Sequence, residues 1–86
     1  MINNYMMFQN LPTLDLHGCN RFEACVLIKE FINDNHKLKN KLIVIVHGKG
    51  KNILKNEVYN ILKTNKSVKE YKLDIFTGGS TIIELK

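Results

Sequence analysis

Several residue types are scarce in this 86-residue chain, and each shortage excludes a class of protein. The chain has no tryptophan, one proline and two cysteines. The spacing of Cys19 and Cys25 fits neither a zinc site nor a redox CxxC pair. No apolar run approaches the roughly 20 residues of a membrane-spanning helix, and the first residues lack the charged and apolar regions of a secretory signal. We therefore expect a cytoplasmic protein with reduced thiols, no membrane partner and no structural metal site.

The length and charge of the chain limit its organisation. A chain of 86 residues buries one modest core, without room for two dinucleotide-binding halves or a separate substrate domain. We expect an N-terminal leader at residues 1–11 and a single domain at residues 12–86. The formal net charge of +5 favours a polyanionic partner, because lysines that bind phosphates release counterions. A lysine-rich surface that contacts only solvent fits the same charge.

The pattern of apolar residues predicts alternating strands and helices. The expected strands cover residues 14–17, 42–46, 68–76 and 81–85. One helix follows Asn20, which is three residues before Glu23 as in a capping box, and fades over residues 33–36. A second helix follows Asn52, its expected cap, and ends before a loop at 65–67. The order β-α-β-α-β-β predicts an α/β fold, a two-layer sandwich of a four-stranded mixed sheet with both helices on one face.

The first expected strand ends in a carboxylate and an imidazole. Asp15 and His17 share one face of a strand because side chains alternate, while the leucines between them face the helices. Both polar side chains would then project into water, where an aspartate can orient a histidine for acid–base work on a phosphodiester. In the alternative interpretation, Asp15 binds loop amides and His17 is an ordinary surface residue.

A second histidine opens a glycine-rich turn between the apolar strand and the second helix. The turn is His47, Gly48, Lys49 and Gly50, and Lys51 follows it. Glycines let backbone amides approach an anion, and a helix N-terminus adds partial positive charge. The spacing is not that of a P-loop or of a dinucleotide fingerprint. Phosphate binding and a plain structural turn remain alternatives.

The remaining motifs carry weaker signals. Residues 78–81 (GGST) predict a hairpin-type turn before the last strand. His36 falls at a helix C-terminus, where an imidazolium suits the helix dipole. Aromatic and basic residues do not interleave along any expected strand, which argues against a base-stacking platform.

Three of these motifs, taken in order, resemble those of the Smr (small MutS-related) domain family, and the resemblance covers residues 12–86. The LDxH motif of the family is matched by residues 14–17 and its [HT]GxG motif by residues 47–50. The closing G-A-T-x-V-x-L pattern is matched by residues 79–85, with serine in place of alanine.

The chain departs from the family pattern at two places. Phe76 and Thr77 stand where further glycine is expected before the last strand, and Asn52 stands where the family often has glycine. These changes affect the shape of the loops more than the chemistry of the site.

The resemblance implies a compact nucleic-acid-binding sandwich that nicks DNA or cleaves RNA. Asp15 and His17 would then be the catalytic candidates. The nucleic-acid-binding candidates are His47, Gly48, Lys49, Gly50, Lys51, Gly79 and Thr81. RNA offers its own 2′-hydroxyl as nucleophile and needs no metal, whereas DNA requires activated water and favours a divalent cation such as Mg²⁺ or Mn²⁺.

Two other functions remain open. The same basic surface could dock on structured RNA, a ribosome or branched DNA beside a repair partner, without catalysis. A small-molecule phosphate-binding enzyme ranks last, because the chain is short and lacks a second layer that could form a sizeable pocket.

Overall fold

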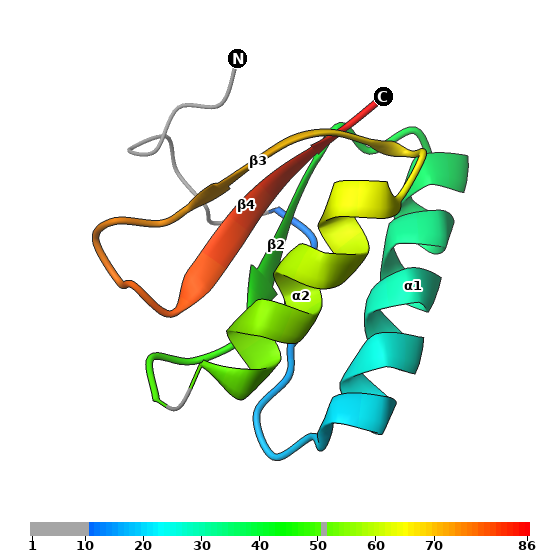
Figure 1. Ribbon diagram of the computed structural model, residues 1–86. Helices are drawn as coiled ribbons and strands as arrows, with labels where there is room; N and C mark the ends of the chain where they lie inside the picture. Colours follow the sequence, from blue (N-terminus) through cyan, green and yellow to red (C-terminus); the bar gives the residue numbers. More distant parts are fainter. Residues whose placement is uncertain (1–10, 51) are drawn as a thin grey trace.

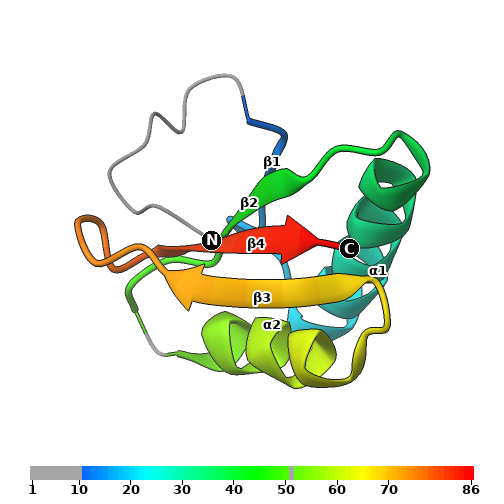
Figure 2. The same cartoon turned by 90° about the horizontal axis from the view of Figure 1, so that it is seen from above.

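The computed structural model describes residues 11–50 and 52–86 (Figure 1). Its elements are β1 (Thr13–Asp15), α1 (Arg21–Lys37), β2 (Leu42–Val46), α2 (Ile53–Thr64), β3 (Val68–Leu73) and β4 (Ser80–Leu85). The strands lie in the order β1-β2-β4-β3, with β1 parallel to β2 and the other two pairs antiparallel. Figure 2 shows both helices on the same face of the sheet. The expected two-layer α/β sandwich with a mixed sheet is confirmed. Residues 1–10 of the expected leader, and Lys51, lie outside the described residues.

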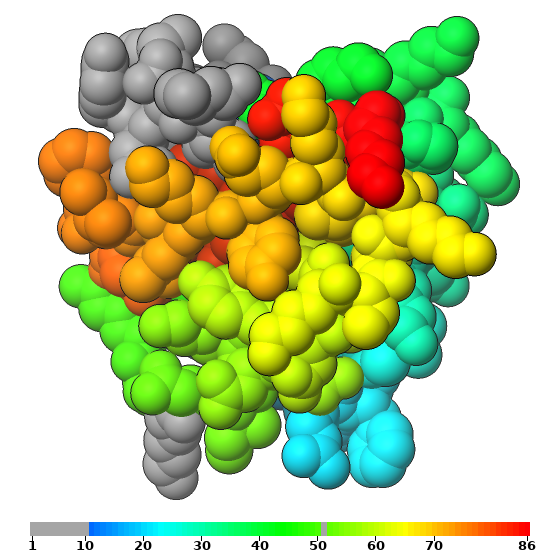
Figure 3. Space-filling view, turned by 45° about the horizontal axis from the view of Figure 1, so that its top comes forward, coloured from blue at the N-terminus to red at the C-terminus, as the bar shows by residue number. Residues whose placement is uncertain are grey.

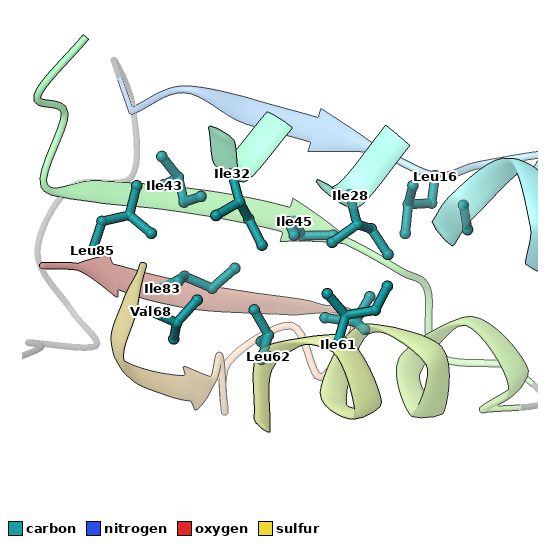
Figure 4. Close-up of a cluster of buried hydrophobic side chains, with 12 residues drawn as sticks. Leu16, Ile28, Ile32, Ile43, Ile45, Ile61, Leu62, Val68, Ile83 and Leu85 are labelled. Carbon is teal, nitrogen blue, oxygen red and sulfur yellow. The ribbon is translucent and has the colours of Figure 1, made fainter. Parts of the chain in front are cut away.

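The core lies between the helices and one face of the sheet (Figure 4). Side chains alternate along β2, so Ile43 and Ile45 face the helices and are fully buried, while Val44 packs on the opposite face with Ile82. Burying an isoleucine of this kind contributes about 1.5–3 kcal/mol. The buried residues of the main core are Leu16, Ala24, Ile28, Ile32, Ile43, Ile45, Val58, Ile61, Leu62, Val68, Ile83 and Leu85.

Helix α1 begins at the expected cap and ends later than expected. The side chain of Asn20 accepts from the Glu23 amide at 2.8 Å, and the Glu23 carboxylate accepts from the Asn20 amide at 2.9 Å, which confirms the capping box. The helix then continues to Lys37 instead of fading over residues 33–36. Asn35 is buried there, donates to the Phe31 carbonyl at 2.8 Å and accepts from the Asn40 side chain at 2.8 Å. These bonds satisfy the buried amide and keep the last turn helical.

Three other boundaries also correct the sequence prediction. Strand β1 ends at Asp15, although the Leu16 amide still donates to the Val46 carbonyl at 2.9 Å. Asn52 occupies the N-cap position of α2 but adopts a left-handed φ of 63°, and within the described residues its side chain makes no cap hydrogen bond. Strand β3 ends at Leu73, because Asp74 begins a turn that extends to Gly79. None of the helices in the described ranges is long and apolar enough to cross a membrane.

Candidate functional site

The two histidine turns leave the sheet at the same end. Strands β1 and β2 are parallel, with Asp15 opposite Val46, so the residues that follow each strand emerge side by side. The first residue of β4, Ser80, also pairs with Val46, which brings the β3–β4 loop to this end. Figure 1 shows the loop after β1 at the bottom of the molecule, the green loop after β2 at the lower left, and the orange β3–β4 loop at the left above it. The topology therefore gathers three glycine-containing loops at one end of the sheet.

His17 is presented to solvent by the turn after β1. Leu16 is fully buried, and the residues on either side of it, Asp15 and His17, are exposed as the alternation predicts. The Asp15 carboxylate oxygen Oδ1 accepts from the backbone amide of His17 at 2.9 Å, and Gly18 completes the turn with φ 80°. This hydrogen bond is the loop-amide contact that the sequence left as an alternative to a carboxylate–imidazole pair. It orders the backbone that presents His17.

His47 is buried, with 7% of its surface exposed. Its Nδ1 lies 3.1 Å from the Gly48 carbonyl oxygen, and its Nε2 lies 2.8 Å from the Thr81 hydroxyl. A carbonyl oxygen only accepts, so Nδ1 carries the proton and the Nε2 of the neutral ring accepts from Thr81. Burial lowers the pKa of His47 below its usual 6.5; the Gly48 carbonyl opposes this shift, and the charge of Lys55 adds to it.

Helix α2 covers the His47 ring through Tyr59. The Tyr59 ring meets the His47 ring edge-on, with centroids 6.4 Å apart and planes at 78°. The Tyr59 hydroxyl lies 3.5 Å from the Thr81 hydroxyl, and the Lys55 ammonium stands 5.9 Å from the Tyr59 ring centroid. Sequence reasoning missed this polar cluster. The i, i+4 spacing of Lys55 and Tyr59 on a helix was the available signal.

The glycine turn is tied to the start of β4 through one carbonyl. The Gly79 carbonyl accepts from the amides of His47 and Gly48, both at 2.9 Å. Gly48 has φ 87°, a conformation that glycine adopts without strain. A Cβ placed on Gly79 would lie 3.5 Å from the Lys49 Cγ, so the stem of Lys49 runs along this backbone. Gly48, Lys49 and Gly50 themselves are exposed.

Three residues predicted to bind nucleic acid are buried beneath the glycine turn, and their role in binding stays a prediction. His47, Gly79 and Thr81 are buried and are occupied by contacts with one another. These side chains are buried because side chains alternate along a strand, and Thr81 and His47 both fall on the side of neighbouring strands that faces the helices. Gly48, Lys49 and Gly50 are exposed, although the amide and carbonyl of Gly48 are already engaged with Gly79 and His47.

A buried carboxylate orders the β3–β4 loop, and sequence reasoning missed it. Asp74 is 1% exposed, and its carboxylate accepts from the Phe76 amide at 3.0 Å and from the Thr77 hydroxyl at 3.2 Å. Its backbone carbonyl accepts from the Gly78 amide at 2.8 Å, and its amide donates to the Ser80 carbonyl at 2.9 Å. An aspartate two residues before a turn amide is the usual Asx-turn pattern, which was the signal in the sequence.

The first two motifs line a common pocket of about 300 Å³. Its lining residues are Asp15, His17, Gly18, Val46, His47, Gly48 and Leu54. A wider pocket of about 510 Å³ lies on the other side of His17 and is lined by His17, Gly18, Cys19, Glu23, Val26 and Leu27. His17 and Gly18 belong to both, so the imidazole is accessible from two directions. Across residues 11–50 and 52–86, no three His, Cys, Asp or Glu side chains gather closely enough to hold a metal ion.

Comparison with known proteins identifies the family. The family model described as "Smr domain" matches residues 14–86. The chain belongs to the Smr-domain family. The resemblance inferred from the three motifs is thereby confirmed over nearly the whole described domain.

Curated relatives of this Smr domain are much longer proteins. It is 34% identical over 77 residues to a protein named endonuclease MutS2 from Clostridium kluyveri, and 36% identical over 76 residues to one of the same name from Clostridium botulinum. The aligned regions cover 86% and 85% of this chain but 10% of each relative. The chain therefore spans about a tenth of the length of these relatives.

Two solved structures share the fold of this Smr domain. The Smr domain of Thermus thermophilus MutS2 superposes with a TM-score of 0.82 at 23% identity, over 88% of this chain and 99% of that chain. YdaL, a stand-alone small MutS-related protein from Escherichia coli, gives a TM-score of 0.79 at 23% identity, over 86% of this chain and 63% of that chain. At this level of identity, the likeness establishes the architecture.

Proposed function

We propose that this Smr domain binds nucleic acid at the loop end of its sheet and cleaves a phosphodiester bond there. The observation that carries the proposal is the 300 Å³ pocket, which places His17 and Asp15 beside the exposed glycine turn at Gly48. The endonuclease name of the MutS2 relatives and the net charge of +5 support the same activity.

His17 is the proton-transfer group in this proposal. Its imidazole is exposed, ordered at its backbone by Asp15, and accessible from both pockets. On RNA, His17 takes the proton of the 2′-hydroxyl as that oxygen attacks phosphorus, and the bond from phosphorus to the 5′-oxygen breaks. The leaving 5′-oxygen takes a proton from solvent, so the products are a 2′,3′-cyclic phosphate and a 5′-hydroxyl.

The glycine turn holds the phosphate. Gly48 and Gly50 are exposed and bring the backbone of the turn close to a bound anion, and Lys49 supplies a positive charge beside them. The Lys49 ammonium stabilises the negative charge that develops on the phosphoryl oxygens, because the Gly48 amide already donates to the Gly79 carbonyl. His47, Thr81 and Gly79 keep the turn in this shape from beneath. Lys51, which lies outside the described residues, adds charge next to the turn in the sequence.

Cleavage of matched ribose and deoxyribose strands tests the proposal. Purified protein is incubated with labelled single-stranded, duplex and branched substrates of each sugar, with Mg²⁺, with Mn²⁺ and with a chelator. Cleavage of ribose strands that survives the chelator and leaves a 2′,3′-cyclic phosphate supports the route above. Cleavage of deoxyribose strands that requires Mg²⁺ or Mn²⁺ would replace the internal nucleophile with metal-activated water.

The variant His17→Ala and a matched control complete this test. His36 is an exposed histidine in the last turn of α1, at the far end of a 17-residue helix about 24 Å long. We expect His17→Ala to abolish cleavage and His36→Ala to cut at the parental rate. Equal cutting by His17→Ala and the parent protein would refute the role of His17.

One observation favours a second candidate function, a binding module without catalysis. The Asp15 carboxylate bonds the backbone of His17 rather than its ring, so the aspartate contributes to the shape of the turn as much as to chemistry. This candidate predicts salt-dependent binding to structured RNA, a ribosome or branched DNA that survives His17→Ala, with no strand cut at any protein concentration.

A further inference from the structure

The loop between β3 and β4 combines a rigid base with an apolar tip. Asp74 is buried and holds the amide of Phe76 and the hydroxyl of Thr77, so the backbone of the loop is fixed from inside. Ile75 and Phe76 are nevertheless 68% and 69% exposed. A large aromatic ring held in water by an ordered backbone is costly to leave uncovered, because its apolar surface is hydrated.

The loop that carries this apolar tip lies beside the cationic part of the proposed site. The stem of Lys49 runs along Gly78 and Gly79 of the same loop, and the Gly79 carbonyl holds the amides of His47 and Gly48. Figure 3 shows the orange surface of the loop next to the green surface of the glycine turn. The whole domain measures 29 × 26 × 21 Å, so this loop is within the length of a few nucleotides from Gly48.

From this arrangement we infer that Phe76 stacks on an unpaired nucleobase next to the phosphate that the glycine turn holds. The inference rests on the proposed nucleic-acid binding and adds a structural preference to it. A lysine for the backbone with an adjacent aromatic face for the base is the combination that recognises single strands. In a continuous duplex the bases are already stacked on one another, so Phe76 selects a strand with a base that is free to leave the stack.

Phe76 is also a feature of this particular chain. It stands where the family pattern has further glycine, and a glycine offers no surface to a base. The four strands found within residues 11–50 and 52–86 carry no row of aromatic residues, so the contact is a single stacked base at a loop tip. Ile75 extends the apolar surface beside it.

A tryptophan at this position provides a direct probe, because the natural chain has none. The full chain carrying Phe76→Trp is titrated with a single-stranded oligonucleotide and with a fully paired duplex of equal total charge. We expect quenching of the tryptophan fluorescence by the single strand and little change with the duplex. In parallel, Phe76→Ala should bind the single strand about tenfold more weakly, and Phe76→Leu should not restore binding, since leucine lacks a ring face.

Two further measurements keep the inference distinct from the proposed function. Thermal unfolding of each variant should match that of the parent, because residue 76 is largely exposed. If the parent protein binds the strand while the fluorescence of the Phe76→Trp variant stays constant at saturation, or Phe76→Ala binds equally well, the stacking inference is wrong and nucleic-acid binding stands. If the parent protein binds no strand, the proposed function fails first, and the inference fails with it.

Discussion

His17 and His47 occupy equivalent places in the chain and opposite environments in the fold. Each follows a strand and precedes a glycine with positive φ, 80° at Gly18 and 87° at Gly48. His17 is exposed, whereas His47 is 7% exposed and hydrogen-bonded through both ring nitrogens. The same local sequence therefore produces one ring that is exposed to solvent and one that supports the turn.

The difference arises from the phase of each strand. In the first strand segment Leu14 and Leu16 point toward the helices, so His17 points away from them. In β2 the helix-facing residues are Ile43 and Ile45, and His47 continues their series onto Tyr59 of α2. A histidine one residue further along its strand points to the opposite face, so its position in the alternation decides whether it is exposed or buried.

The largest expected effect is on cleavage, when each histidine is replaced by alanine. His17→Ala should reduce the cleavage rate about 100-fold or more, because it removes the proton-transfer group. Since the ring is exposed, the free energy of unfolding should change by less than about 0.5 kcal/mol. Single-turnover cleavage and urea unfolding of the same samples measure both. A His17→Ala protein that cuts at the parental rate but has a lower free energy of unfolding would show that His17 stabilises the fold and does not act in cleavage.

His47→Ala should show the opposite pattern. It removes the 2.8 Å partner of the buried Thr81 hydroxyl, which keeps only the more distant Tyr59 hydroxyl, and it opens a space under Tyr59. The free energy of unfolding should fall by about 2 kcal/mol, within the range for removing one member of a buried polar pair. Thr81→Val provides the control: if the two residues act through their hydrogen bond, the double variant loses less than the sum of the single losses.

The sequence predicted the fold and the exposure of His17 because both depend on the alternation of apolar and polar residues. The apolar and polar residues of 14–17 alternate, which placed Leu16 inside and His17 outside correctly. The run at 42–46 is apolar throughout, as in a strand covered on both faces. Such a run does not show which of its residues face the helices, so His47 could not be assigned to the interior.

The supports of the site depend on contacts between residues far apart in the chain. His47 bonds Thr81, which lies 34 residues away, and only the β2–β4 register brings them together. The buried carboxylate of Asp74 was hidden for a related reason: an acidic residue at a strand end looks like a solvated one until its loop folds over it. Local patterns predict such turns, but burial is a property of the whole fold.

The third expected effect is a pH dependence of the free energy of unfolding, which is caused by the titration of His47. Its pKa in the folded protein is lowered below 6.5, chiefly by burial. The unfolded chain therefore binds more protons between the folded pKa and 6.5, so folding stability rises with pH through that interval. Stability from the neutral ring is fully present above 6.5 and is lost as the pH falls toward the folded pKa. Thermal unfolding from pH 5 to 7.5 should show the advantage of the parent protein over His47→Ala shrinking at low pH. A constant advantage would mean that the ring is not held neutral.

The smallest effect concerns the glycines that follow the two histidines. Alanine at Gly18 or Gly48 must adopt a left-handed φ, which costs about 1–2 kcal/mol, and its Cβ would have open space among the described atoms at both places. The two variants should therefore lose equal free energy of unfolding, within about 0.5 kcal/mol. Gly50→Ala is the matched control, because Gly50 has similar space without a left-handed φ and should lose little. A much larger loss at Gly48 than at Gly18 would mean that His47 and Gly79 constrain their turn beyond its backbone geometry, and that the two turns differ in rigidity as well as in the exposure of their histidines.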